Sequence, residues 1–261
     1  MTTPTPLDAA HAAMDAAPDD TGPRLRFFER LADAELFLLL ENEPEGDGID
    51  PRVFDTEDGR FVLAFDREDR LAEFAGGIAP YAALPGRVLA GMLQGQSLGL
   101  AINPDVAPSA MLLGVDAITW LTETLAHGPT QTEARPQEVT APTGLPESLL
   151  TALDAKLAAM TGRATLAYLA GVTYDTGARG HLLAFIDVVQ GAEGALARAV
   201  NEALAFSGLE AGSLDVAFLR AADPVSAQLA RVGLRFDLPQ HDAPDPRPAP
   251  GTNPDKPPIL R

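Results

Sequence analysis

The chain of 261 residues contains no cysteine. Disulfide bonds, thiolate catalysis and cysteine-ligated zinc or iron–sulfur centres are therefore excluded. Its longest purely apolar runs, such as residues 36–40, are about five residues long, whereas a membrane-spanning helix needs ~20. No basic residue precedes an apolar run in residues 1–14, so we expect no secretory signal. Together these absences predict a soluble, cytoplasmic protein.

Positive charge is also scarce. The chain has 19 lysines and arginines against 37 aspartates and glutamates, which gives a formal net charge of −18. A surface of this sign repels phosphate backbones and anionic lipid headgroups, so we expect neither a nucleic-acid partner nor a membrane partner. The same charge keeps a protein in solution without any further role, and it is compatible with a basic protein partner.

Residues 58–74 are the most informative part of the sequence. They predict a turn, a buried strand and a helix in immediate succession, which is typical of an α/β protein. Both faces of the strand at residues 60–65 are apolar, so we expect an interior strand that is covered on two sides. Asp66 stands where a helix N-cap belongs, and the Gly76–Gly77 pair ends the helix.

Composition divides the rest of the chain. Residues 128–144 are polar and rich in proline and glycine, which predicts a linker, and eight of the 23 residues from 239 to 261 are proline, which predicts a disordered tail. Residues 1–23 form a helical or flexible lead. The predicted fold is mixed α/β, with two small domains at residues 24–127 and 145–238, each a mixed sheet packed with helices.

Periodicity predicts the individual elements. The expected helices cover residues 7–17, 23–34, 66–75, 85–93, 115–126, 146–160, 192–207 and 224–232. The expected strands cover residues 36–40, 53–55, 60–65, 97–102, 111–114, 165–174, 181–189, 214–219 and 234–238.

No set of residues predicts a catalytic, metal or cofactor site. His181 and Asp187 share a strand face but stand ~20 Å apart, too far for a hydrogen bond. Ser97 fits a Gly-x-Ser-x-Gly spacing between Gly95 and Gly99, yet it follows a helix and precedes a strand, the reverse of a nucleophile elbow. The acidic run at residues 41–48 lacks the order of a calcium loop. We therefore expect no cofactor and no metal.

Five residues are weak candidates for binding. Trp120 points away from the apolar stripe of its helix, so it either packs against another part of the chain or contacts a partner. Tyr81, Gln94, Gln96 and Asn103 occupy predicted turns around the strand at residues 97–102, where they are able to line a small cleft. Polar residues that only form turns are the alternative.

Several segments resemble a known family. They are residues 35–39, 59–71, 98–104 and 117–121, and they resemble the N-terminal domain of the SseB family of bacterial proteins, over about residues 24–126. Residues 145–238 resemble the accompanying SseB C-terminal domain. The resemblance implies a cytoplasmic protein and no assigned reaction, cofactor or catalytic residue. A protein of a type III secretion system has the same name, so a role in secretion would rest on the shared name alone.

These observations lead to a hypothesis about function. We expect a non-enzymatic binding or regulatory module that acts through protein–protein contacts. The alternative is a small-molecule sensor or enzyme, linked to amino-acid chemistry, with a cleft near residues 94–103 or between the domains. Self-association is a third interpretation.

Overall fold

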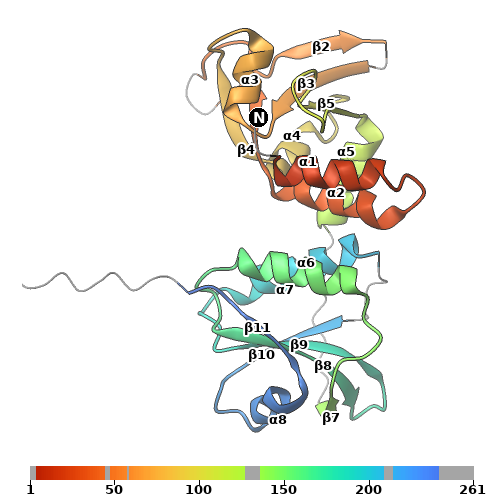
Figure 1. Cartoon of the computed structure of the whole chain (residues 1–261). Coiled ribbons are helices and arrows are strands. Elements are labelled where there is room, and N and C mark those ends of the chain that lie inside the picture. The colour runs from red at the N-terminus through yellow and green to blue at the C-terminus, as the bar shows by residue number, and fades with distance from the viewer. Residues whose placement is uncertain (1–3, 45–47, 58, 127–135, 209–213, 241–261) are drawn as a thin grey trace, which may run out of the picture.

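The computed structural model describes residues 4–44, 48–57, 59–126, 136–208 and 214–240. In these ranges the chain forms two units, each a mixed β-sheet with helices on both faces, which confirms the predicted mixed α/β fold (Figure 1). One helical layer of the first unit packs against one helical layer of the second (Figure 1). None of the described helices combines the length and the apolar character that a membrane crossing requires.

The first domain contains five helices and six strands among its described residues. The helices are α1 (Pro6–Asp15), α2 (Thr21–Asp33), α3 (Glu68–Ala75), α4 (Gly86–Leu93) and α5 (Val115–Ala126). The strands are β1 (Glu35–Leu39), β2 (Val53–Thr56), β3 (Gly59–Phe65), β4 (Tyr81–Pro85), β5 (Gly99–Ile102) and β6 (Met111–Leu113). Their order in the sheet is β4-β1-β3-β5-β6, and β2 pairs with the first half of β3.

The second domain is also a mixed sheet covered by helices, with fewer helices among its described residues. Its described helices are α6 (Glu147–Ala158), α7 (Glu193–Phe206) and α8 (Pro224–Val232). Its strands are β7 (Pro136–Thr140), β8 (Leu166–Tyr174), β9 (Arg179–Ile186), β10 (Leu214–Leu219) and β11 (Leu234–Asp237). The order is β10-β9-β8-β11, with β7 also paired to β8, and β10 runs parallel to β9.

The strand β3 is buried on both faces, as its sequence predicts. Val62 and Ala64 belong to the core beneath α1, α2, α4 and α5, whereas Phe61, Leu63 and Phe65 pack on the side of α3. The antiparallel pair β2–β3 closes at Thr56 and Gly59, which confirms the predicted hairpin. On its other side β3 runs parallel to β5, so the two strands end at the same edge of the sheet.

The helix after β3 begins differently from the prediction. Its N-cap residue is Arg67, which makes no side-chain capping bond, and the first helical residue is Glu68. The predicted capping role of Asp66 is wrong because its carboxylate accepts hydrogen bonds from Thr5 and Arg70 instead. A tertiary contact thus replaces a local one. Gly76 ends the helix with a φ of 73°, a left-handed conformation that favours glycine.

Three observations bear on the predicted division of the chain, which stays a prediction. Helix α1 lies in the predicted lead, but it places Leu7 in the same core as α2. Strand β7 lies in the predicted linker and was not predicted as a strand, but it pairs with β8. The two strands are close: a Cβ added to Gly171 would lie 2.6 Å from Thr140 Oγ1. The predicted disordered tail falls outside the described residues beyond residue 240.

Candidate functional site

The carboxyl ends of β3 and β5 meet at one edge of the first sheet, and a polar side chain follows each strand. Asp66 follows β3 and Asn103 follows β5. Asn103 is fully buried, and its Oδ1 accepts a hydrogen bond from the backbone N–H of Asp66 at 3.0 Å. Its Nδ2 donates to Ser109 Oγ at 2.9 Å. Ligand sites of open α/β sheets lie outside such strand ends, so this edge is the first place to look for one.

The polar cluster continues to Asp8 on α1 through charged groups. The guanidinium of Arg70 donates to Asp8 Oδ2 at 2.6 Å and to Asp66 Oδ1 at 2.7 Å, and Ser109 Oγ donates to Asp8 Oδ1 at 2.5 Å. Burial alone would raise the pKa of Asp8, but the hydrogen bonds from Arg70 and Ser109 outweigh burial and hold this pKa well below its usual range. Asp8 is therefore a permanent carboxylate that ties α1 to the edge of the sheet.

The polar side chains of this cluster are hydrogen-bonded to one another. Ser109 donates its hydrogen bond to a carboxylate that is already bound to an arginine, so no basic group activates the hydroxyl. His11, one turn after Asp8, instead lies 3.5 Å from Asp15 and contacts the ring of Phe27. The arrangement holds α1, α3 and the sheet edge together and offers no nucleophile.

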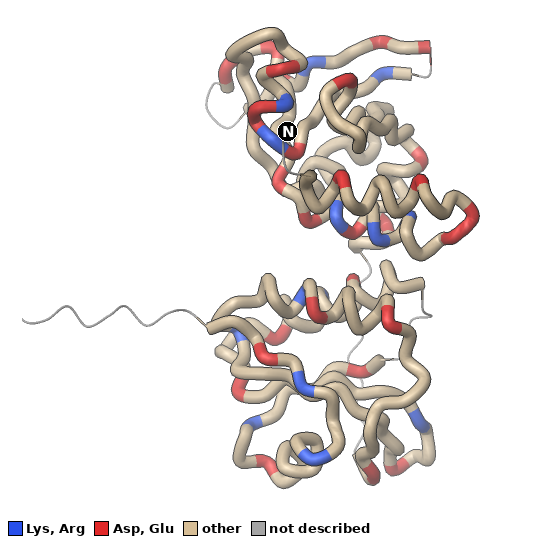
Figure 2. The backbone as a smooth tube through the Cα atoms, viewed as in Figure 1, with Lys and Arg blue, Asp and Glu red and all other residues tan. Residues whose placement is uncertain are grey.

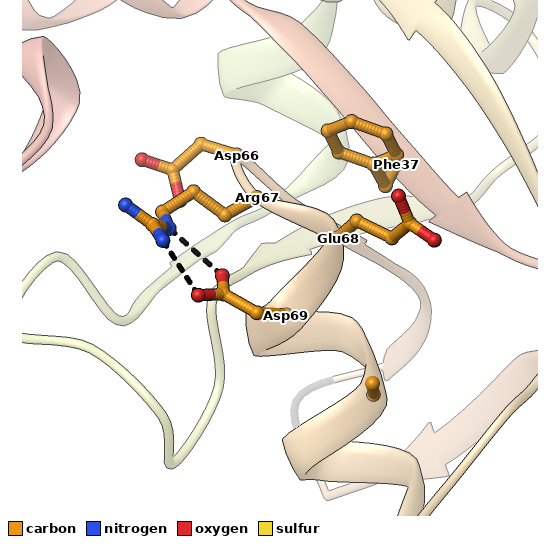
Figure 3. Close-up of a pocket in the computed structure, with 6 residues that line it drawn as sticks. Phe37, Asp66, Arg67, Glu68 and Asp69 are labelled. Atoms are coloured by element: carbon orange, nitrogen blue, oxygen red, sulfur yellow. Dashed lines mark hydrogen bonds and ion pairs between the residues drawn. The ribbon is translucent and has the colours of Figure 1, made fainter. Parts of the chain in front are cut away.

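A hollow of about 580 Å³ lies beside this edge and is shown in Figure 3. It is lined by Phe37, Asp66, Arg67, Glu68, Asp69 and Ala72. Arg67 donates two hydrogen bonds to Asp69, at 2.8 and 2.6 Å, so these charges neutralise one another at the rim (Figure 3). The hollow thus presents paired charges to solvent.

A second polar group of residues joins the two domains. Lys156 on α6 donates to Asp33 Oδ2 of α2 at 2.6 Å and to Glu202 Oε2 of α7 at 3.0 Å. Arg87 on α4 also reaches both carboxylates, donating to Glu202 at 2.7 and 3.0 Å and to Asp33. Figure 2 shows residues of both charges on the helices that face one another. We call Glu29, Asp33, Arg87, Lys156 and Glu202 the junction network.

The carboxylates of the junction network have different electrostatic states. Burial works against the charged form of Glu202, yet hydrogen bonds from Arg87 and the charge of Lys156 outweigh burial and lower its pKa. Glu29 is buried too, and burial raises its pKa; the charge of Lys156, whose Nζ lies 3.8 Å from Oε1, lowers this pKa but does not outweigh burial. Its Oε1 has no hydrogen-bond partner among the described residues.

Trp120 lies beside the junction network. Its ring packs edge-on against Phe28 of α2, with ring centroids 4.9 Å apart, and against Phe206 of α7 at 6.3 Å. Phe206 is buried in the core of the first domain although it belongs to the second. The indole therefore packs between the domains while 37% of the residue stays exposed. A contact between Trp120 and a partner stays a prediction.

A cleft of about 400 Å³ opens between α2, α4, α6 and α7, next to the junction network. Its charged lining consists of Arg30, Asp33, Arg87, Lys156, Arg198 and Glu202, and its apolar lining consists of Ala155, Ala159, Met160, Ala195 and Ala199. Four cationic and two anionic side chains give this lining a net charge of +2, opposite in sign to the chain as a whole.

A comparison with protein families identifies the first domain. Residues 7–120 match the family model of the SseB protein N-terminal domain. The first domain is therefore an SseB N-terminal domain. No curated protein and no solved structure matches the chain.

The SseB N-terminal match spans α1 to Trp120 and so includes the polar cluster at the sheet edge as well as Glu29, Asp33 and Arg87. The remaining network residues, Lys156 and Glu202, come from the second domain. The resemblance of that domain to an SseB C-terminal domain stays a prediction.

The structure separates the other predicted binding residues of this SseB N-terminal domain. Tyr81 lies in β4, an edge strand separated from β5 by β1 and β3, and its partial burial and a hydrogen bond to Glu68 raise its pKa. Gln94 and Gln96 lie exposed after α4. Asn103 is buried within the polar cluster. The four therefore do not line one cleft, and their role in binding stays a prediction.

The junction network was missed in the sequence, although a signal was present. Lys156 lies between Leu153 and Leu157 on the apolar face of α6, and Glu29 follows the buried Phe28 on α2. A charge inside an apolar helix stripe requires a partner from another element, because an unpaired buried charge is costly. That rule predicts a partner for each of these residues but does not identify it. Among the described residues no group of three or more histidines or carboxylates is arranged to hold a metal ion.

Proposed function

We propose that this protein is a non-enzymatic protein-binding module that pairs an extended segment of a partner with the open edge of β10. The proposal depends on one observation, which is that one edge of β10 is unpaired among the described residues. Within the described chain β10 pairs only with β9, so the hydrogen-bonding groups on its other side face outward. Such an edge is a template for another strand.

The side chains of β10 support this role. Five of the six residues in Leu214–Leu219 are apolar, and Asp215 is the single charge. Proteins usually protect an exposed edge with lysine, proline or a bulge, and β10 carries neither lysine nor proline. Phe218 stacks on Phe185 of β9 and is 38% exposed, so an incoming strand would cover it. The net charge of −18 favours a partner segment with basic residues.

The proposal is tested with extended peptides selected for binding to the full chain from a random library. We expect the selected peptides to alternate apolar and basic residues and to slow hydrogen exchange of the amides at residues 214–219. Phe218→Lys places a charge on the edge and should weaken binding roughly ten-fold or more, which is about 1.4 kcal/mol. Phe218→Leu keeps an apolar side chain and should retain most of the affinity.

Leu112→Lys provides the matched control, because Leu112 is 52% exposed on β6, an outer strand of the other sheet. Peptides that bind the control and the Phe218→Lys variant equally, or that protect a different segment, would contradict the proposal. If light scattering shows a dimer, and Phe218→Lys dissociates it, the segment that pairs with β10 comes from a second copy of this chain and not from another protein.

Small-molecule binding is the second candidate, and the cleft between the domains favours it. A cleft near residues 94–103 receives no support, because Asn103 is buried with its amide groups hydrogen-bonded. The inter-domain cleft is open and lined by charged and apolar side chains. Thermal-shift screening with amino acids and nucleotides separates this candidate from peptide binding, since Phe218→Lys should leave any such shift unchanged.

A further inference from the structure

The cleft between α2, α4, α6 and α7 contains two cations that make no direct contact with a carboxylate of the described residues, and the charge of Arg30 acts on Glu29 only at longer range. Arg87 and Lys156 are bound to Asp33 and Glu202. For Arg30 and Arg198, by contrast, the described residues provide no hydrogen bond and no ion pair. Both side chains line the cleft, Arg30 from the first domain and Arg198 from the second.

The remainder of the cleft has the properties of a small-molecule site. Its volume of about 400 Å³ lies in the usual range of ligand pockets, roughly 300–1,000 Å³. Alanines on α6 and α7 and the side chain of Met160 provide an apolar wall, whereas the arginines provide planar donors that fit an oxyanion. An organic molecule that combines an apolar part with an anionic group is complementary to both parts of this lining.

We propose that this cleft binds a small organic anion, whose carboxylate or phosphate group is held by Arg30 and Arg198 while its apolar part lies against the helices α6 and α7. The cationic lining attracts such a ligand although the surface as a whole repels anions, because a cleft focuses the field of the charges that line it. This site is separate from the edge of β10, so either proposal stands or fails without the other.

Binding at this site would connect the two domains. A ligand held by one arginine from each domain stabilises the arrangement in which both reach it, and by linkage it raises the stability of the folded chain. Trp120 packs against Phe206 at the same junction, so the fluorescence of the single tryptophan would report on binding. The site thus gives a regulatory ligand a direct effect on the contact between the domains.

The test measures binding to the full chain by calorimetry, with inorganic phosphate and succinate as probes. Sodium chloride at equal ionic strength is the control for general salt effects. Phosphate and succinate distinguish the two anionic groups, and the proposal predicts that at least one of them binds and raises the unfolding temperature above the chloride value. Equal unfolding temperatures in all three salts, with no heat of binding, would overturn it.

Substitutions locate the site. Arg30→Gln and Arg198→Gln should each weaken binding roughly ten-fold or more, since a hydrogen bond to a charged group is lost. Arg24→Gln is the matched control, because Arg24 is an exposed arginine of α2 that does not line the cleft. Arg30→Lys keeps the charge and should retain part of the affinity. Binding that survives the double variant Arg30→Gln/Arg198→Gln, with far-ultraviolet circular dichroism unchanged, would overturn the assignment.

Discussion

Replacing Lys156 with methionine should destabilise the junction between the domains. The ammonium group lies 2.6 Å from Asp33 Oδ2, 3.0 Å from Glu202 Oε2 and 3.8 Å from Glu29 Oε1. Methionine has a similar length and no charge, so the core around it stays filled. Arg87 would then be the remaining cation of the junction network, bound to Asp33 and Glu202, and Glu29 would lose the ammonium group beside it.

The size of this effect follows from the burial of the network. Removing one partner of a buried ion pair costs about 3–5 kcal/mol, because the other charge is left uncompensated in the interior. Arg87 keeps its hydrogen bonds to Glu202 and Asp33, so we expect the lower end, about 3 kcal/mol. For a chain of this size each kcal/mol corresponds to ~2–4 °C, which predicts a fall in Tm of about 6–12 °C.

The loss should depend on pH in a defined direction. The pKa of Glu202 is lower in the folded protein than in the unfolded chain, so its stabilising contribution is present above the unfolded pKa and is lost as the pH falls through the folded pKa. The difference in unfolding free energy between wild type and Lys156→Met should therefore be largest near neutral pH and shrink on acidification.

Urea unfolding measures this difference through the fluorescence of Trp120 and through far-ultraviolet circular dichroism. Arg163→Met is the control, because Arg163 is exposed and its substitution removes a positive charge outside the junction network. A loss below about 1 kcal/mol at neutral pH, the size expected of an exposed pair, would refute the reasoning, and so would a loss that is equal in acid.

Three further substitutions test other parts of the structure by the same unfolding measurement. Glu29→Gln should raise the free energy of unfolding by about 1 kcal/mol at pH above the raised pKa of Glu29, because burial disfavours the carboxylate more than the charge of Lys156 favours it; the gain should shrink as the pH falls below that pKa and vanish below the ordinary pKa of a glutamate, and a gain that persists in stronger acid would contradict the assignment. Asn103→Ala removes the hydrogen bond of the Asp66 backbone N–H and one of the two hydrogen bonds of Ser109, and should cost about 2–3 kcal/mol, whereas a cost under about 1 kcal/mol would mean that water replaces the amide. Gly86→Ala places a Cβ 1.8 Å from the carbonyl oxygen of Leu31 and should cost about 2 kcal/mol or more, while Gly91→Ala in the same helix meets nothing within 4 Å and should be stabilising; equal effects would contradict the close approach of α2 and α4.

Much of the fold could be predicted because its signals are local. The two apolar faces of residues 60–65 predict a doubly covered strand, and β3 is buried as expected. The turn at Thr56 to Gly59 predicts the hairpin, which pairs in that register. Strand β7 was not predicted, because its polar sequence carries no period-2 pattern and its order comes from pairing with β8.

The candidate sites were less accessible to sequence reasoning, and Asp66 shows why. Its position before a helix predicts a cap, but Arg70 and Thr5 provide stronger partners, and Thr5 lies 61 residues away in the chain. Asn103 was found as a polar residue near a strand end, whereas its burial depends on Ser109 and on the end of β3. Contacts of this range leave no periodic trace in the sequence.

Composition and periodicity are enough to assign the class of this protein: cysteine-free, strongly acidic, and built of helices and strands with one or two apolar faces. Which charges meet depends on the tertiary structure. Glu29, Arg87, Lys156 and Glu202 come from four helices, and Arg30 and Arg198 from opposite sides of one cleft. Hydrophobic periodicity is a property of neighbouring residues, but the pairing of buried charges depends on how whole helices pack, so it appears only in the folded chain.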